Sequence, residues 1–341
     1  MQDIRFTETI LRWYAENGRD LPWRRTRDPY AVWLSEIILQ QTRIAQGTAY
    51  WESFMEHFPT VADLAAASED EVLRLWQGLG YYSRARNLHA AARQIVAAGG
   101  FPSTLEGIRA LPGVGDYTAA AIGSIAFGLP AAVVDGNVYR VLARYYGIAT
   151  PIGTGAARKE FTALATSLLP SDAAAFNQGL MDFGAMVCTP ASPSCADCPL
   201  AAGCRAFREG RVALLPVKKP AAAVQERHLS YVYIRCAGFT AIHRRGPGDI
   251  WQGLWEPLVL KGAFAPEDVG LQTALRFSTL RTGVKHQLTH RTIYADFYLW
   301  ECSERPSLPS DYIWVAESAF LSDYGKPRLV ELLLEVLAEC P

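Results

Sequence analysis

The spacing of apolar residues changes once along this chain, and that change limits the folds it can adopt. Up to about residue 204, apolar side chains recur at helical spacing, as in EDEVLRLWQGL and RNLHAAARQIVAA. After His228 the apolar residues recur at every second position. In HRTIYADFYLW one strand face would hold Ile293, Ala295, Phe297 and Leu299. The pattern predicts an all-α domain followed by a smaller α+β domain.

Composition suggests where these domains begin and end. The stretch RAFREGRVALLPVKKPAAAVQER holds two prolines and mixed charge, which predicts an exposed connector. We therefore expect a helical domain over residues 1–204, a linker over 205–227 and a second domain over 228–341, closing with an amphipathic helix from Pro327 to Glu339. A chain of 341 residues is long enough for two cores.

The bulk composition excludes some classes of protein but points to no partner. Half of the residues are hydrophobic (50%) and a fifth are charged (20%), as in ordinary globular proteins. No apolar run approaches the roughly 20 residues of a membrane helix, and MQDIRFTETILRWY lacks the blocks of a secretion signal. We therefore expect a cytoplasmic protein. The net charge of −1 gives no sign of a nucleic-acid partner.

Four of the seven cysteines fall within CTPASPSCADCPLAAGC, with the spacing C-x6-C-x2-C-x5-C: Cys188, Cys195, Cys198 and Cys204. The reducing cytosol disfavours disulfides, so this clustering predicts a metal site. Zinc modules usually carry two short knuckles, whereas one compact loop suits a cuboidal iron–sulfur cluster, and the spacing leaves both open. Cys236, Cys302 and Cys340 are far apart in sequence and are expected to be small core residues.

A glycine turn separates two predicted helices in LPGVGDYTAAAI, residues 111–122. The segment before it has a helical apolar period and a possible capping box from Ser103 to Glu106, and residues 117–127 are rich in alanine. Gly113 and Gly115 could simply allow close helix packing. Alternatively, their N–H groups and the positive end of the second helix could bind an anion.

Two carboxylates stand at notable positions in the helical half. In WLSEIILQQTRIAQ, read as one helix with Ile44 and Ala45 on its buried stripe, Glu36 falls on another face. The pattern alone therefore favours a solvated Glu36. Asp135 directly precedes the helical stretch NVYRVLARYY, which is typical of an N-cap.

Together, the helix–LPGVG–helix unit, VVDGNVYRVLARYYG and the cysteine loop resemble the helix-hairpin-helix DNA glycosylases of the endonuclease III superfamily. WLSEIILQQT and GLGYYSRARNLH are similar to the adenine DNA glycosylases of the MutY family, over roughly residues 5–204. A weaker similarity to that family's Nudix-like domain continues to the end. The resemblance implies a monomer, associated with the bacterial nucleoid, that carries one 4Fe–4S cluster on the four cysteines. Its substrate would be duplex DNA with adenine mispaired with 8-oxoguanine or guanine, in base excision repair.

The resemblance also implies catalytic roles. Glu36 would protonate adenine at N7, while Asp135 would stabilise or capture the oxocarbenium ion and Asn137 would add a polar contact. Such a division fits glycoside hydrolysis, because a carboxyl in an apolar pocket has a raised pKa and one held by N–H groups stays ionised. Lyase members of the superfamily have a lysine where this chain has Tyr117. A phenol cannot form a Schiff base, so we expect a monofunctional glycosylase.

Contacts with DNA follow from the same resemblance. The hairpin glycines Gly113 and Gly115 would hold a phosphate. Tyr81 and Gln41 would wedge beside 8-oxoguanine once the adenine is flipped out, with further candidate contacts at Leu39, Thr42 and Leu79. The adenine pocket would be lined by Arg19, Trp23, Arg24 and Gln178.

The C-terminal half departs from the family pattern at one motif. QLTHRTIYADF aligns with a Phe-Ser-His motif that here reads Leu288, Thr289 and His290. Threonine keeps the hydroxyl, but leucine lacks the ring, so the preference for 8-oxoguanine over guanine stays open. Of the paired glutamates in a catalytic Nudix box only Glu267-Asp268 occurs, so nucleotide hydrolysis is not expected.

Two rival functions remain at this stage. One is a lyase of the endonuclease III type acting on oxidised pyrimidines, which Tyr117 opposes and a strand-nicking assay would distinguish. The other is a non-catalytic protein that binds DNA or transfers electrons through the cluster. Glu36 and Asp135, each within its motif, oppose the second.

Overall fold

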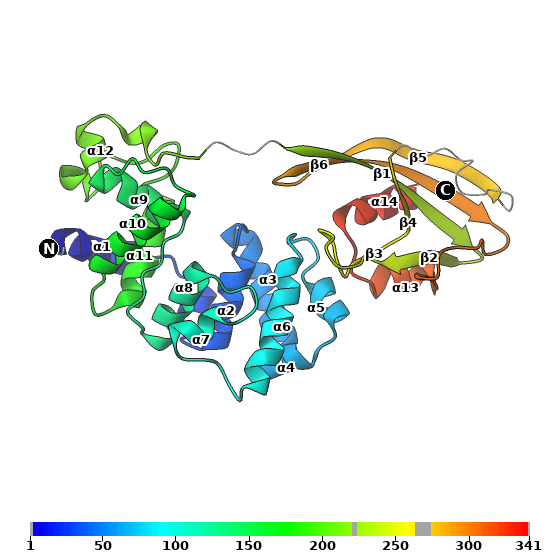
Figure 1. Ribbon diagram of the computed structural model, residues 1–341, viewed down its shortest axis with the longest axis horizontal. Helices are drawn as coiled ribbons and strands as arrows, with labels where there is room; N and C mark the ends of the chain where they lie inside the picture. The colour runs from blue at the N-terminus through cyan, green and yellow to red at the C-terminus, as the bar shows by residue number, and fades with distance from the viewer. Residues whose placement is uncertain (1–2, 220–223, 263–273, 340–341) are drawn as a thin grey trace. The chain divides into compact units, whose positions relative to one another are not determined.

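The computed structural model describes residues 3–219, 224–262 and 274–339 (Figure 1). Within these ranges no helix combines the length and the apolar character needed to cross a membrane. The chain divides into two compact units, the first formed by Met1–Ala65 with Ala90–Pro220 and the second by Ala66–His89 with Ala221–Pro341. The domains expected from chain order differ from these units in two respects. Residues 66–89 belong with the C-terminal part, and residues 205–220 of the expected linker belong with the first unit.

The first unit is helical, as the apolar spacing predicts. Its helices, together with those of residues 66–97, are α1 Ile4–Asn17, α2 Pro29–Ile38, α3 Ile44–His57, α4 Val61–Ala66, α5 Glu69–Leu75, α6 Ser83–Ala97, α7 Leu105–Arg109, α8 Asp116–Phe127, α9 Gly136–Tyr146, α10 Gly155–Ser167, α11 Ala173–Met186 and α12 Arg205–Arg208. Helices α1, α9, α10 and α11 share one apolar core, and residues of α2 and α8 form another, to which Met181 of α11 also contributes. Helix α11 therefore joins the two cores.

Helix starts in this unit coincide with short polar side chains. Asp28, Asp135 and Thr154 each accept a hydrogen bond from a backbone N–H in the first turn of α2, α9 and α10. These bonds satisfy amide groups that the helix itself leaves unpaired. The capping box expected from Ser103 is wrong, because α7 begins one residue later with Thr104 as the N-cap.

The expectation of a single helix over WLSEIILQQTRIAQ is also wrong. Helix α2 ends at Ile38, and α3 begins only at Ile44. Between them a turn bonds the Thr42 N–H to the Leu39 carbonyl (3.2 Å), and Gln41 adopts a left-handed φ of 57°. A left-handed residue interrupts the helical hydrogen-bond ladder, yet neither glycine nor proline marks the site in the sequence.

Part of the expected connector is packed rather than exposed. Ala206 and Leu215 are buried in the core of the first unit, and α12 lies within this segment. The apolar residues of RAFREGRVALL therefore extend the helical core, which the mixed charge around them conceals.

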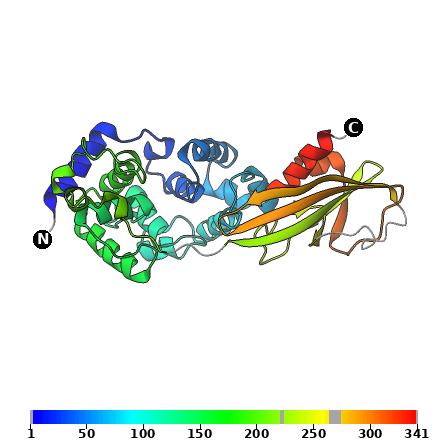
Figure 2. The same cartoon turned by 90° about the horizontal axis from the view of Figure 1, so that it is seen from above.

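The second unit contains a mixed sheet, with the strand order β3-β2-β1-β6-β5. Its elements are β1 Gln225–Cys236, β2 Phe239–Arg244, β3 Trp255–Glu256, β4 Leu258–Lys261, β5 Ala274–Gln287, β6 Arg291–Cys302, β7 Tyr312–Ala316, α13 Glu317–Ser322 and α14 Arg328–Glu339. Strands β1 and β6 run parallel, while β4 pairs with β1 and β7 with β2, both antiparallel. Figure 2 shows the long strands β5 and β6 side by side.

The alternation expected in β6 is confirmed. Its predicted inner face is buried throughout, at Ile293, Ala295, Phe297 and Leu299. Cys236 and Cys302 are buried as expected, whereas Cys340 and the pair Glu267-Asp268 lie outside the described residues.

The segment 66–89 is held in the second unit by polar contacts. Arg244 of β2 lies 3.0 Å from Glu69 and 3.3 Å from Asp70, both in α5. Arg86 of α6 donates to the carbonyl of Gln252 (2.6 Å). The spacing of apolar residues along α5 and α6 does not predict such partners, because they lie more than 160 residues away in the sequence.

Candidate functional site

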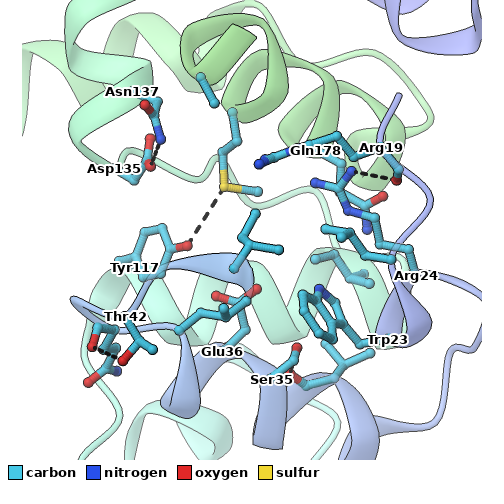
Figure 3. A pocket seen from close by; sticks show the side chains of 18 of the residues that line it. Arg19, Trp23, Arg24, Ser35, Glu36, Thr42, Tyr117, Asp135, Asn137 and Gln178 are labelled. Atoms are coloured by element: carbon cyan, nitrogen blue, oxygen red, sulfur yellow. Dashed lines mark hydrogen bonds between the residues drawn. The ribbon is translucent and has the colours of Figure 1, made fainter. Parts of the chain in front are cut away.

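A cavity of about 400 Å³ lies inside the first unit, within the size range of small-molecule sites (Figure 3). Its walls come from α2, α8, α9, α11, the turn after α2 and the short 3-10 helix Pro22–Arg24. It brings together many of the residues singled out in the sequence: Arg19, Trp23, Arg24, Glu36, Leu39, Gln41, Thr42, Tyr117, Asp135, Asn137 and Gln178. These residues come from five separate stretches of chain.

Glu36 is buried, with 9% of its surface exposed, so the solvated position favoured by the pattern is wrong. Helix α2 is enclosed on every side, and all of its residues after Pro29 are buried. Burial raises the pKa of Glu36 to about 7, with Asp135 adding to the rise and Tyr117 and Arg24 opposing it. A carboxyl with this pKa can hold and release a proton near neutral pH.

Tyr117, in the first turn of α8, donates a hydrogen bond from its hydroxyl to the sulfur of Met181 (3.7 Å). Tyr117 also lies close enough to Glu36 to lower the pKa of that carboxyl. Burial, with Glu36 and Asp135 nearby, raises the pKa of Tyr117 well above its usual value, so the side chain is a neutral donor. Among the described residues that line the cavity there is no lysine.

Asp135 is the N-cap of α9, as the sequence predicts. Its Oδ1 accepts from the Val138 N–H (2.8 Å) and its Oδ2 from the Asn137 side-chain amide (2.8 Å). Burial nevertheless raises the pKa of Asp135, although these hydrogen bonds oppose the rise. The sequence pattern of an N-cap indicates these hydrogen bonds but not the burial of the carboxyl.

Arg140 is a supporting residue that sequence reasoning missed. It donates to Oδ1 of Asn137 (2.8 Å), which leaves the Asn137 amide hydrogens for Asp135. Its Nε also donates to the carbonyl of Cys188 (2.6 Å), the first residue of the cysteine loop. Asp135 is therefore connected to that loop through side chains. The only sequence signal is that Asn137 and Arg140 are three residues apart on one helix.

At the other end of the cavity, Arg19 and Arg24 both bind the fully buried carboxylate of Asp182. Arg24 contacts its two oxygens at 2.6 and 2.8 Å, and the Arg19 Nε contacts one at 2.9 Å. Although burial raises the pKa of Asp182, these bonds outweigh it and leave the pKa below its usual value. Both predicted pocket arginines are thereby fixed, and Trp23 is buried beside them.

The residues expected to read the lesion fall in different units. Leu39, Gln41 and Thr42 line the cavity through the turn after α2. In the second unit Tyr81 is exposed with a left-handed φ of 48°, and its hydroxyl shares a hydrogen bond with that of Thr289.

The neighbours of Tyr81 and Thr289 differ in exposure. Thr289 and His290 are both exposed in the turn between β5 and β6. A hydrogen bond from the Leu288 N–H to the Arg291 carbonyl (2.8 Å) closes this turn. Leu79 is buried, with 9% of its surface exposed. The Leu79 side chain is therefore less accessible to DNA than we expected from the sequence.

The hairpin LPGVG has the geometry of a tight turn before α8. Gly113 has φ = 76°, a left-handed conformation that favours glycine, and the Val114 N–H bonds to the Leu111 carbonyl (3.1 Å). Gly115 is the N-cap of α8 and provides no side chain to cap it. The first amides of α8 are therefore left to bind an external acceptor.

The four clustered cysteines line one small cavity, of about 30 Å³, in the first unit. The guanidinium of Arg144 donates to the sulfur of Cys188 at 3.4 Å, and the thiol of Cys204 donates to the Arg144 carbonyl at 3.5 Å. Among the described residues, no three His, Cys, Asp or Glu side chains converge on a point that could hold a single metal ion.

Two parts of the chain match known protein families. Residues 34–166 match the HhH-GPD superfamily of base excision DNA repair proteins, and residues 230–336 match the NUDIX domain. These matches confirm the expected fold class, an all-α helix-hairpin-helix domain followed by an α+β Nudix-like domain. A solved structure titled as a thermostable thymine-DNA glycosylase superposes with a TM-score of 0.55 at 33% identity, covering 60% of this chain and 96% of that one.

Two curated relatives are both named adenine DNA glycosylase. The human protein is 46% identical over 213 residues, which cover 59% of this chain but only 39% of the human one. The protein of Buchnera aphidicola subsp. Schizaphis graminum is 36% identical over 254 residues, which cover 73% of each chain. This chain thus spans about two fifths of the human relative and most of the bacterial one.

Proposed function

The chain belongs to the adenine DNA glycosylase family, and from this premise we propose that it hydrolyses the N-glycosidic bond of adenine mispaired with 8-oxoguanine or guanine in duplex DNA. The proposal rests on one observation, that two carboxyl groups in different environments line the same cavity. Glu36 is buried with a pKa of about 7, and Asp135 is held by hydrogen bonds from Val138 and Asn137.

In the proposed mechanism, adenine leaves the base stack and enters the cavity, because its glycosidic bond is out of reach inside the duplex. Glu36 in its acid form gives its proton to N7, which makes the base a better leaving group. As the bond to the sugar breaks, positive charge develops on the sugar, and ionised Asp135 stabilises or captures it. Asn137 holds the Asp135 carboxylate toward this position. Water then adds to the sugar carbon and loses a proton, which leaves an abasic site and free adenine.

Single-turnover kinetics test the function directly. Enzyme in excess is mixed with a duplex carrying adenine opposite 8-oxoguanine, and release of the base is followed as alkali-labile sites. We expect rapid release of adenine. The control duplex, which is identical except for thymine opposite 8-oxoguanine, should release no thymine. A protein that released thymine, or released neither base, would contradict the proposal.

DNA contacts are proposed at three places. The N–H groups around Gly113 and Gly115 would bind a backbone phosphate, because the amides at the start of α8 lack a side-chain cap. Gln41 and Tyr81 both have left-handed backbones, which persist only where the surrounding structure imposes them. By resemblance to the family, both would contact 8-oxoguanine, and Thr289 would support Tyr81 through their shared hydrogen bond.

We further propose that the enzyme is monofunctional, because the position of the lyase lysine is occupied by Tyr117. The wild type should yield intact strands that break only with alkali. Tyr117→Lys should gain weak strand nicking and a borohydride-trapped DNA adduct, since an amine beside Glu36 could attack the sugar. The gain is expected to be small, because a misplacement of about 1 Å can cost ~10²-fold in rate.

The control for this experiment is Tyr117→Phe, which removes the hydroxyl without adding an amine and should not nick. Robust nicking by the wild type would contradict the monofunctional assignment. The exposed Lys159 would then be the first residue to replace.

The cysteine loop fits an iron–sulfur cluster. Cys188, Cys195, Cys198 and Cys204 line one cavity without converging on a single point. One zinc ion needs four sulfurs at about 2.3 Å, whereas a cluster spreads its ligands over several irons. Arg144 donates to the Cys188 sulfur, as expected around a sulfur that carries negative charge. A bound 4Fe–4S cluster would fix the loop and supply a redox-active centre.

Purified protein is accordingly expected to be yellow-brown, with about four irons and four sulfides per chain. Cys198→Ser should yield poorly soluble protein or protein unable to bind DNA, because the ligands organise the loop. Cys236→Ser, which changes a buried cysteine of the second unit, is the control and should retain the iron. Stoichiometric zinc without visible absorbance would contradict the iron–sulfur assignment.

A further inference from the structure

Tyr14 of α1 is bonded to a residue of the cavity wall without lining the cavity itself. Its hydroxyl donates to Oε1 of Gln178 in α11, at 2.5 Å. Figure 3 shows Gln178 across the pocket from Glu36. We propose that Tyr14 is a positioning residue, which holds the Gln178 amide so that its NH₂ group faces the cavity and donates to a ring nitrogen of the bound purine. This inference rests on the proposed function.

The surroundings of Tyr14 determine the direction of this hydrogen bond. The guanidinium of Arg24 lies over the Tyr14 ring, 5.8 Å from its centroid, and offers only donors. The nearby Asp182 carboxylate already accepts from Arg19 and Arg24 through both oxygens. The amide oxygen of Gln178 is therefore the acceptor left for the phenol proton. Burial raises the pKa of Tyr14, so the hydroxyl keeps that proton at neutral pH.

Two glycines leave room for the Tyr14 side chain. A Cβ atom on Gly18 would lie 2.7 Å from Cε2 of Tyr14, and one on Gly179 would lie 2.9 Å from its Cβ. Gly179 directly follows Gln178, so the ring packs against the backbone of the residue pair that carries the amide. A side chain at either glycine would clash with Tyr14, so the two glycines allow the phenol to lie against α11 and reach Gln178.

With its oxygen turned toward the Tyr14 hydroxyl, the Gln178 amide offers the N–H donors of its NH₂ group to a ligand in the cavity. Adenine has ring-nitrogen acceptors on the edge away from N7, namely N1 and N3, and Glu36 is assigned to N7. A site with a fixed polar group discriminates strongly against an analogue that lacks the matching atom. Gln178 should therefore donate a hydrogen bond to N1 or N3, and Tyr14 should keep the amide in the orientation that makes this bond possible.

The experiment compares release of adenine, 1-deazaadenine and 3-deazaadenine opposite 8-oxoguanine under single turnover. Each deaza analogue replaces one acceptor nitrogen with C–H. The rate penalty of an analogue is the release rate of adenine divided by that of the analogue. This ratio is then divided by the same ratio in Gln178→Ala, which cancels the intrinsic difference in leaving ability. In the wild type we expect one analogue to show a penalty of about tenfold, the size of one hydrogen bond to a buried group.

Tyr14→Phe should reduce this penalty to about twofold or less, because the amide can then rotate. Gln178→Glu should lose the penalty as well, since it keeps the bond from Tyr14 but replaces the donor NH₂ with oxygen. In a Gln178→Ala background, Tyr14→Phe should change nothing further. Tyr30→Phe is the matched control, because its buried hydroxyl bonds to the Phe58 carbonyl (2.7 Å), and it should leave the penalty intact.

An equal penalty in Tyr14→Phe and wild type, or no penalty in the wild type, would overturn the role of Tyr14 while adenine release upheld the proposed function. A wild type that releases no adenine would refute both. A purely structural role would lower thermal stability in Tyr14→Phe without changing the penalty, and that result also overturns the inference.

Discussion

Glu36→Gln is expected to abolish adenine release while duplex binding stays nearly unchanged. The substitution keeps the shape of the side chain but removes the proton that Glu36 gives to the base. General-acid catalysis typically contributes about 10²–10⁴ in rate, so the single-turnover rate should fall by at least ~10². Rate and binding are measured on the same duplex with adenine opposite 8-oxoguanine. A variant that kept more than about a tenth of the wild-type rate would remove Glu36 from its catalytic role.

The same assignment gives a direction for the pH dependence. Burial raises the pKa of Glu36 to about 7, and the acid form is the active one. The rate should therefore be highest below pH 7 and fall as pH rises through that value. The residual rate of Glu36→Gln should not show this fall.

Stability measurements distinguish lost chemistry from lost folding. The folded pKa of Glu36 lies above its ordinary 4.5, so folding favours the protonated form. That stabilisation is present below about pH 4.5 and is lost as pH rises through about 7. A rise from 4.5 to about 7 corresponds to on the order of 3 kcal/mol, at 1.36 kcal/mol per pKa unit. Denaturant unfolding should thus show Glu36→Gln to be more stable than wild type at pH 8, with a smaller difference at pH 5.

Asp135→Asn should lower the rate of adenine release by ~10²–10³, the usual cost of removing one preorganised electrostatic group from a transition state. Asparagine is as good an N-cap as aspartate, so α9 should keep its first turn and the variant should fold. Only the negative charge opposite the developing cation is lost. Single-turnover rates and circular dichroism measure the two effects.

Asp172→Asn is the matched control for this prediction. Asp172 caps α11 in the same way, accepting from the Ala175 N–H at 3.0 Å, but it is exposed and does not line the cavity. Its variant should release adenine at the wild-type rate. If Asp135→Asn also kept that rate, Asp135 would be a helix cap and nothing more.

Much of the fold could be predicted because it depends on local periodicity and short-range caps. The alternation through Ile293 and Phe297 predicted the buried face of β6, and the apolar repeats predicted most of the helices. Asp135 was predicted as an N-cap because that bond closes within three residues. The turn at Gln41 was missed, since no glycine or proline marks its left-handed backbone.

Resemblance to a known family supplied most of the candidate site, and the sequence pattern by itself supplied less. The spacing of Cys188, Cys195, Cys198 and Cys204 indicated a metal site, and LPGVG indicated a turn that could bind an anion. For Glu36 the helical pattern alone gave the wrong environment. A single helix shows which residues share a face, but not whether another helix covers that face.

Local patterns in the sequence are therefore enough to predict most of the helices, the alternation in β6 and the motifs between these elements. The burial of Glu36 and the contacts of Asp182 with Arg24 and of Tyr14 with Gln178 arise from tertiary packing. These partners lie more than 150 residues apart in the sequence, and no periodicity links them. Burial and long-range hydrogen bonds are what shift a carboxyl's pKa and orient an amide, so the chemistry of the cavity depends on packing that local patterns do not encode.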